Sequence, residues 1–174
     1  MTNHIVLFEP LMPANTGNIA RTCAGTDTVL DLIKPLGFSV DDKHLKRAGL
    51  DYWNKVDIRY HDNLPAFLEK VTDPENMFLI SKFGTKTYTD PDYHDVDQDY
   101  YFVFGKETTG LPERFEQQYA RQALRIPQDD EHIRALNLSN TCAIVIYEAL
   151  RQQSFVGLER VHTYEHDKLK EFKD

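Results

Sequence analysis

The stretch ALNLSNTCAIVIYEALRQQ, residues 135–153, places three amide- or hydroxyl-bearing side chains just before an apolar helix pattern. From Cys142 onward apolar residues recur at three- and four-residue spacing, which predicts an amphipathic helix. Such a helix needs one N-cap, a short side-chain oxygen that accepts a hydrogen bond from a first-turn amide. If Ser139 is the cap, Asn137 and Asn140 remain available to bind a ligand or a neighbouring loop.

A second candidate stretch, EPLMPANTGNIAR (residues 9–21), leads from a predicted strand into a predicted helix. It lacks the GxGxxG pattern of dinucleotide-binding loops, so a nucleotide site of that kind is not expected. Asn15 or Thr16 is expected to cap the helix, and Arg21 follows Asn15 by less than two turns. Both side chains can face one cleft, or Asn15 is only a cap and Arg21 only a surface cation.

A third candidate, YYFVFGKETTGLPE (residues 100–113), is an apolar strand pattern that ends at Gly105. A glycine at this point would let a ligand lie against the backbone. Glu107 follows at the mouth of the strand, where its carboxylate either faces a cationic ligand or orients backbone amides. A purely structural turn is the alternative.

The elements that position these groups alternate along the chain. Apolar runs of strand length, bounded by Gly, Pro, Asp or Asn, occupy residues 4–10, 29–37, 56–62, 76–84, 100–107 and 123–127. Helix patterns occupy residues 15–26, 45–49, 63–71, 112–120 and the stretch after 142. This alternation predicts a single α/β domain with a mainly parallel sheet flanked by helices. In such sheets ligands bind beyond the carboxyl ends of the strands, where the three candidate stretches lie.

Length and composition indicate one globular domain of 174 residues. We expect residues 1–156 to form this domain and residues 157–174 to form a charged C-terminal tail. No segment approaches the roughly 20 apolar residues of a membrane span, and no secretory signal precedes the first strand, so a cytoplasmic protein is expected. Cys23 and Cys142 stand alone in apolar helix patterns. They are expected to be buried, with no disulfide and no metal site.

The formal net charge is −8, and nearly all of it falls in residues 88–174. Residues 89–99 contain five Asp and no base, which predicts a solvated loop. Residues 41–55 instead gather Lys43, Lys46 and Arg47 around an aromatic pair. This segment is either an amphipathic surface helix or a contact for phosphate groups.

Taken in order, NTGNIAR, FGKETTGLP and IP…ALNLSN…YEA resemble the three motifs of the SPOUT class of RNA methyltransferases. The match spans almost the whole chain. Its short length and the segment GFSVDDKHLKRAGLDYW look closest to the minimal tRNA wobble-position (cytidine/uridine) 2'-O-methyltransferases. The resemblance implies a C-terminal trefoil knot, an exception to the rule against knots. It also implies a tRNA substrate and a homodimer in which the first and last helices pack against their mates.

The resemblance further implies S-adenosylmethionine as cofactor, held in the knot loops largely by backbone groups. The residues expected around it are Ile80, Gly105, Glu107, Ile126, Ala135 and Leu136. The family often has Ser at the position of Ala135 and Arg at that of Thr109, and these departures bear on substrate preference.

Arg21, Asn15 and Ser139 are the catalytic positions that the resemblance implies. Arg21 matches an arginine often assigned as the base, but a guanidinium stays protonated in proteins, so we expect it to orient a phosphate or the ribose hydroxyl. The residues expected to contact tRNA are Asn137, Asn140, Arg134 and Tyr147. A dimer that pools the basic 43–55 segments would offset the acidic balance.

Three other functions stay open at this level. A noncatalytic RNA-binding protein would keep the fold without the reaction, and a related enzyme would methylate the ribose of another RNA. A generic nucleotide-binding α/β enzyme would predict a glycine-rich phosphate loop, which the sequence lacks.

Overall fold

The computed structural model describes residues 2–39, 53–162, 164 and 165, and within them seven strands form one sheet. The strands are β1 (Thr2–Phe8), β2 (Val29–Ile33), β3 (Ile58–His61), β4 (Met77–Ile80), β5 (Lys86–Thr87), β6 (Asp99–Gly105) and β7 (Ala123–Arg125). Their order is β3-β2-β1-β6-β4-β7-β5, and every pairing is parallel. The expected single-domain α/β fold with a parallel sheet is confirmed, and the trefoil knot stays a prediction.

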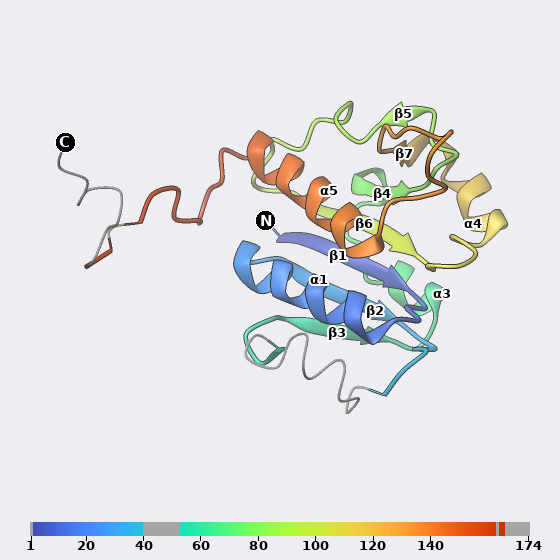
Figure 1. Ribbon diagram of the computed structural model, residues 1–174, viewed down its shortest axis with the longest axis horizontal. Helices are drawn as coiled ribbons and strands as arrows, with labels where there is room; N and C mark the ends of the chain where they lie inside the picture. The colour runs from blue at the N-terminus through green and yellow to red at the C-terminus, as the bar shows by residue number, and fades with distance from the viewer. Residues whose placement is uncertain (1, 40–52, 163, 166–174) are drawn as a thin grey trace.

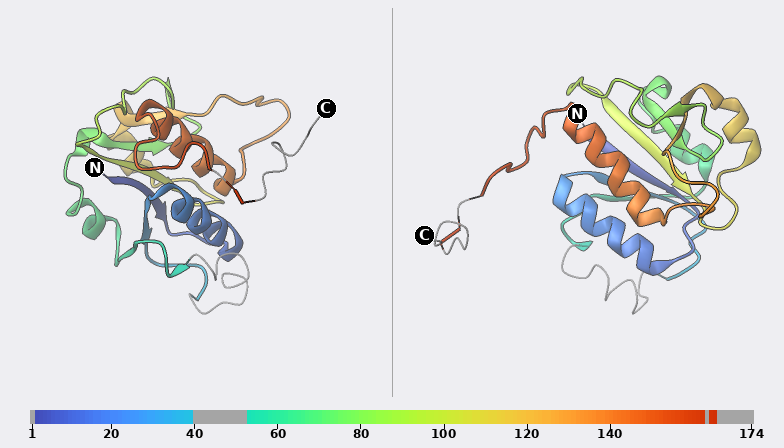
Figure 2. Two further views of the ribbon diagram at one scale, coloured as in Figure 1. Left: turned by 90° about the vertical axis from the view of Figure 1, so that its left-hand side faces the viewer. Right: turned by 45° about the horizontal axis from the view of Figure 1, so that its top comes forward.

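Helices cover both faces of this sheet (Figures 1 and 2). They are α1 (Pro13–Thr26), α3 (Leu64–Leu68), α4 (Glu113–Gln118) and α5 (Leu138–Gln152), with short 3-10 turns η1 (Pro74–Asn76) and η2 (Ala120–Gln122). The two long helices, α1 and α5, lie side by side over one face (Figure 1). The short helices α3 and α4 pack on the other face, through Phe67 and Phe115.

The alternation of side chains along the central strands explains why both faces need a cover. In β1, Ile5 and Leu7 belong to the apolar cluster under α1 and α5, whereas Val6 and Phe8 belong to the cluster under α3 and α4. Successive residues of a strand point to opposite faces. A parallel sheet with two apolar faces must therefore be the middle layer of three.

One polar network interrupts the apolar face under α3. Asp31 of β2 bonds to the Nδ1 atom of His4 in β1 at 2.7 Å and to the Nε2 atom of His61 in β3 at 2.6 Å. All three side chains are buried, and the ring of His4 stacks on that of Tyr101 in β6. The carboxylate thus links three neighbouring strands where solvent does not reach.

Several sequence expectations need correction or stay open. The two-residue strand β5 was not expected, because it is too short to show an alternating pattern. The helix expected at 45–49 and the basic residues Lys43, Lys46 and Arg47 lie outside the described residues. The boundary at residue 156 stays a prediction.

The acidic loop at 89–99, expected to be solvated, has a buried centre that is bonded to the rest of the protein. Four of its five Asp are exposed, but Tyr93 at its centre is fully buried. The Tyr93 hydroxyl donates to the carbonyl of Tyr88 at 2.8 Å, and its backbone amide donates to Gln152 Oε1 of α5 at 2.8 Å. The expectation of solvent exposure was right for the carboxylates and wrong for the loop centre. Burial of the Tyr93 ring in the core holds the loop centre against the protein, although the flanking carboxylates stay in solvent.

Cys23 and Cys142 are both buried in the cluster beneath α1 and α5, which confirms their expected burial. In the described residues no helix is long and apolar enough to cross a membrane. The same part of the chain contains no group of three or more His, Cys, Asp or Glu that could hold a metal ion.

We predict that neither cysteine reacts with a thiol reagent in the folded protein. Burial is the main cause that raises the pKa of both thiols, and the nucleophilic thiolate is therefore scarce. Titration with Ellman's reagent should detect no thiol in buffer and both thiols in guanidinium chloride. A thiol that reacts equally fast under both conditions would contradict the burial.

We also predict that Asp31→Asn lowers the free energy of unfolding by about 2–4 kcal/mol, because the amide keeps one acceptor oxygen where two buried imidazoles each bond to a carboxylate oxygen. Urea denaturation measures this change. Asp57→Asn is the matched control, since Asp57 pairs with Arg59 at the surface and its loss should cost about 0.5 kcal/mol or less. Equal effects of the two variants would show that the network contributes no special stability.

Candidate active site

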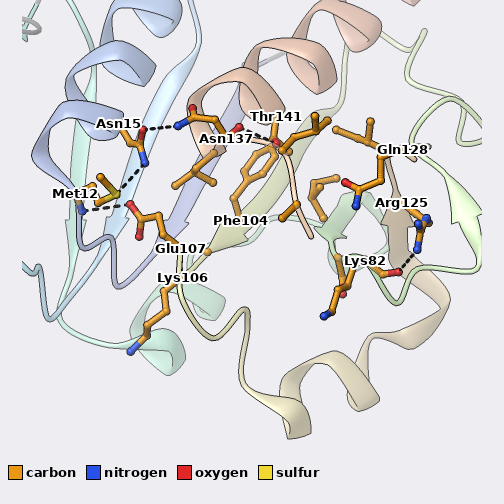
Figure 3. Close-up of a pocket in the computed structure, with 17 residues that line it drawn as sticks. Met12, Asn15, Lys82, Phe104, Lys106, Glu107, Arg125, Gln128, Asn137 and Thr141 are labelled. Carbon is orange, nitrogen blue, oxygen red and sulfur yellow. Dashed lines mark hydrogen bonds between the residues drawn. The ribbon is translucent and has the colours of Figure 1, made fainter. Parts of the chain in front are cut away.

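A cavity of about 520 Å³ opens at the carboxyl ends of β4, β6 and β7 (Figure 3). It is lined by Met12, Asn15, Ile80, Ser81, Lys82, Phe104, Gly105, Lys106, Glu107, Arg125, Ile126, Gln128, Ala135, Leu136, Asn137, Leu138 and Thr141. These residues come from the loops after four strands and from the first turns of α1 and α5. The three sequence stretches that begin at residues 9, 100 and 135 therefore meet at one site.

Apolar and polar groups divide the wall of this cavity. Ile80, Phe104 and Ile126 contribute apolar surface where β4, β6 and β7 end. Charged side chains stand around them: Glu107 and Lys106 on one side and Lys82 and Arg125 on the other (Figure 3). Such a combination suits a ligand with an apolar ring system and a few polar groups.

Gly105 is required by the sheet more than by a ligand. Its φ of +119° is unfavourable for any residue with a Cβ, and a Cβ built there would lie 2.5 Å from the carbonyl oxygen of Phe8. Phe8 is the β1 residue paired with Gly105. The backbone of β1 is therefore one reason for the glycine, and the expectation that a ligand lies against its backbone stays a prediction, since Gly105 also lines the cavity.

Glu107 orients backbone amides, which is one of the two alternatives left open above, and its role toward a cationic ligand stays a prediction. Its carboxylate accepts hydrogen bonds from the backbone amides of Leu11, at 3.0 Å, and Met12, at 3.2 Å (Figure 3). It thereby orients amides at the start of α1 and also lines the cavity. The neighbouring Lys106 forms an ion pair with Glu9 from the same first loop.

The start of α1 differs from the expectation that Asn15 or Thr16 caps it. The N-cap is Met12, without a side-chain cap, and Pro13 occupies the first turn. Proline is favoured there because its φ already suits a helix and its missing N–H has no helical partner to lose. Asn15 instead lies inside the helix, where its side chain is buried and faces the cavity (Figure 3).

The N-cap of α5 is Asn137 and not Ser139. Asn137 Oδ1 accepts from the Ser139 amide at 2.9 Å and from the Ser139 hydroxyl at 2.6 Å. Its Nδ2 atom donates to Asn15 Oδ1 at 3.1 Å (Figure 3). One amide side chain thus caps α5 and also fastens it to α1, so the helix begins at Leu138, earlier than its apolar pattern indicated.

The cavity brings together most, but not all, of the residues singled out from the sequence. All six positions expected around a cofactor line it, as do Asn15 and Asn137. The predicted residues outside the lining are Arg21, Arg134, Ser139, Asn140 and Tyr147. Arg21 lies on the exposed side of α1, roughly 9 Å along the helix from Asn15.

The sequence reasoning missed several lining residues, above all Lys82, Arg125 and Gln128. Arg125 donates to the carbonyl of Lys82 at 2.7 Å and forms an ion pair with Asp130. Hydrogen bonds from Gln128 and Arg125 lower the pKa of the Asp130 carboxyl. No spacing rule in the sequence points to these side chains.

The chain is similar to RNA methyltransferases over most of its length. Residues 2–147 match the model of the SpoU rRNA Methylase family. A Lactobacillus gasseri protein provisionally named RNA (cytidine(34)-2'-O)-methyltransferase is 64% identical over 98% of this chain and 92% of its own length. The tRNA (cytidine(34)-2'-O)-methyltransferase of Yersinia pestis is 46% identical over 88% of this chain and 96% of its own.

A solved structure is similar as well. It is described as structural insights into the 2-OH methylation of C/U34 on tRNA, and it has a TM-score of 0.79 and 39% identity to this chain. The alignment covers 88% of this chain and 97% of that structure. The residues that match the family model, 2–147, include every residue that lines the cavity.

We predict a coupling free energy of about 1 kcal/mol between Asn15 and Asn137, from the hydrogen bond that joins α1 to α5. A double-mutant cycle of Asn15→Ala and Asn137→Ala, followed by urea denaturation, measures it. The control cycle pairs Asn15→Ala with Asn140→Ala, whose effects should add to within about 0.5 kcal/mol. Additive effects in the first cycle would argue against the link.

Proposed function

Because this chain belongs to the SpoU rRNA methylase family, we propose that it transfers a methyl group from S-adenosylmethionine to a ribose 2'-hydroxyl of tRNA. The proposed position is the anticodon wobble nucleotide, a cytidine or a modified uridine, as the names of the relatives suggest. The observation that supports it best is the meeting of all three motif loops at one cavity.

The cavity suits S-adenosylmethionine in size and in the chemistry of its walls. A volume of about 520 Å³ lies within the usual range for small-molecule sites. Five of the six residues named for the cofactor provide apolar surface and backbone groups, and the sixth, Glu107, provides a carboxylate on one side. An adenine ring fits the apolar part, and a sulfonium cation is favoured near the carboxylate.

The chemistry supplied by the bound cofactor is an electrophilic methyl group on a sulfonium. The residues of this chain then have to hold the ribose hydroxyl in line with that methyl group, and such positioning accounts for much of the acceleration. Asn15 and Asn137 fix the α1 and α5 ends of the cavity through their shared hydrogen bond. Ser139 acts through Asn137, to which its hydroxyl donates.

Arg21 is proposed as a positioning residue that binds a phosphate or orients the hydroxyl. Its guanidinium stays protonated, so it is a poor base, and its place on the exposed side of α1 suits contact with a large substrate. Arg134, Asn140 and Tyr147 lie outside the cavity lining and are proposed to contact the tRNA around it.

We further propose that the chain is a homodimer in which α1 and α5 pack against their mates. Ile144 is exposed on α5, which leaves apolar surface for such a contact. The C-terminal trefoil knot and a cytoplasmic location are proposed from family membership together with the tRNA substrate.

Two other functions remain alternatives. The family is named for rRNA methylation, so a ribose in another RNA is one of them. A noncatalytic RNA-binding protein is the other. The intact cavity and its Asn15, Glu107 and Asn137 contacts favour an enzyme.

The test is transfer of labelled methyl from S-adenosylmethionine to total tRNA that lacks this modification, followed by mapping of the labelled nucleotide. We expect label at the wobble ribose. Arg21→Ala should reduce the rate on the order of 100-fold, because a displaced substrate loses its alignment. Arg59→Ala is the matched control and should keep full activity, since Arg59 pairs with Asp57 at the edge strand β3.

The pattern of label separates the alternatives. In a parallel reaction with rRNA as the acceptor, label in rRNA and none in tRNA would favour methylation of another RNA. Binding of both cofactor and tRNA without transfer would favour the noncatalytic protein.

A further inference from the structure

The turn after β4, residues 81–84, is held firmly against β7. The amide of Ser81 donates to the carbonyl of Leu124 at 2.9 Å, and the amide of Gly84 closes the turn on the carbonyl of Ser81 at 3.1 Å. A Cβ on Gly84 would lie 2.5 Å from the carbonyl carbon of Leu124. The two backbones are therefore packed as closely as a glycine allows.

Side chains fasten the same turn. Arg125 of β7 donates to the carbonyl of Lys82 at 2.7 Å, and the hydroxyl of Ser81 accepts from the amide of Phe83 at 3.2 Å. The turn thus has bonds to β7 on one side and internal bonds on the other. Its conformation is set by the sheet.

This firmly held turn presents an aromatic ring to solvent. Phe83 is 71% exposed, and the Lys82 amino group lies over its ring, 5.0 Å from the centroid. A single exposed apolar residue is ordinary on a protein surface. A phenyl ring on a rigid turn, next to a cation and at the rim of a ligand cavity, is a more specific arrangement.

Lys82 and Phe83 lie beside the cavity. Ile80, Ser81 and Lys82 all line the cavity, and Phe83 is the next residue. Figure 3 shows Lys82 and Lys106 on opposite sides of the cavity, both extending away from α5. An RNA whose ribose enters this cavity has to leave its base and the adjoining phosphates near the rim.

We propose that Phe83 and Lys82 form a binding site for an unpaired nucleobase of the RNA substrate. The base stacks on the phenyl ring, and the lysine attracts the neighbouring phosphate. This inference rests on the proposed function, because it assumes that the ligand at the cavity is RNA. It assigns to the turn after β4 the task of holding one nucleotide beside the reacting ribose.

The physical chemistry favours a base over a protein side chain as the occupant. Every nucleobase has a π face, so an exposed ring binds single-stranded RNA without regard to sequence. Stacking of one base on an aromatic side chain changes RNA affinity roughly 5- to 150-fold. A rigid turn increases this effect, because the ring does not have to be ordered on binding.

The test compares variants of Phe83 in RNA binding and in methyl transfer. Phe83→Leu removes the π face and keeps apolar bulk, whereas Phe83→Tyr keeps the ring. Val96→Ala is the control. Val96 is an exposed apolar residue in the acidic loop before β6, at the amino ends of the strands and so opposite the cavity. A fluorescent anticodon stem-loop transcript reports RNA affinity, calorimetry reports S-adenosylmethionine affinity, and the transfer assay reports KM and kcat.

We expect Phe83→Leu to weaken RNA binding and raise KM for tRNA by about tenfold, with S-adenosylmethionine affinity unchanged. Phe83→Tyr should bind RNA as the native protein does, and Val96→Ala should change neither value. RNA affinity that is unchanged in Phe83→Leu, or a loss that Phe83→Tyr does not restore, would overturn the stacking site. Native protein that transfers no methyl group would refute the proposed function instead, while the RNA-binding comparison would still test the site.

Discussion

The arrangement of this protein depends on one constraint, the parallel pairing of β6 with β1 on one side and with β4 on the other. Parallel strands direct all their carboxyl ends to one edge, and helices have to cover both faces because both are apolar. Loops separated by more than 90 residues then meet at that edge. At the end of the β1–β6 ladder, Gly105 lies against Phe8 so closely that no side chain would fit between them.

Hydrogen bonds between segments that are distant in sequence fix the loops around the cavity. Glu107 binds two amides at the start of α1, and Asn137 joins α5 to Asn15. At the other end of α5, Gln153 forms a reciprocal pair with Asn3 of β1, at 2.8 and 3.1 Å. Helix α5 is thus bound at both ends to the N-terminal segment, so the cavity wall that it forms is a rigid one.

The net charge of −8 is unevenly distributed, with acidic and basic side chains at different ends of the sheet. The acidic loop lies before β6, whereas Lys82, Lys106 and Arg125 stand at the cavity beyond the carboxyl ends of the strands. Lys106 and Arg125 are paired with Glu9 and Asp130, which fixes their positions. An acidic protein can therefore present fixed cations where a polyanion would approach, because screening confines electrostatic attraction to about 10 Å.

The sequence by itself determined the α/β class, six of the seven strands in the described residues, the burial of Cys23 and Cys142, and the family. These follow from periodicity, strand-ending residues and ordered motifs, which are local properties. It did not determine that Asn137 caps α5, that Gly105 faces β1, or that Lys82 and Arg125 line the cavity. Only the tertiary structure decided these, because each depends on a partner that is remote in sequence, and no spacing rule encodes the distance between segments brought together by a sheet.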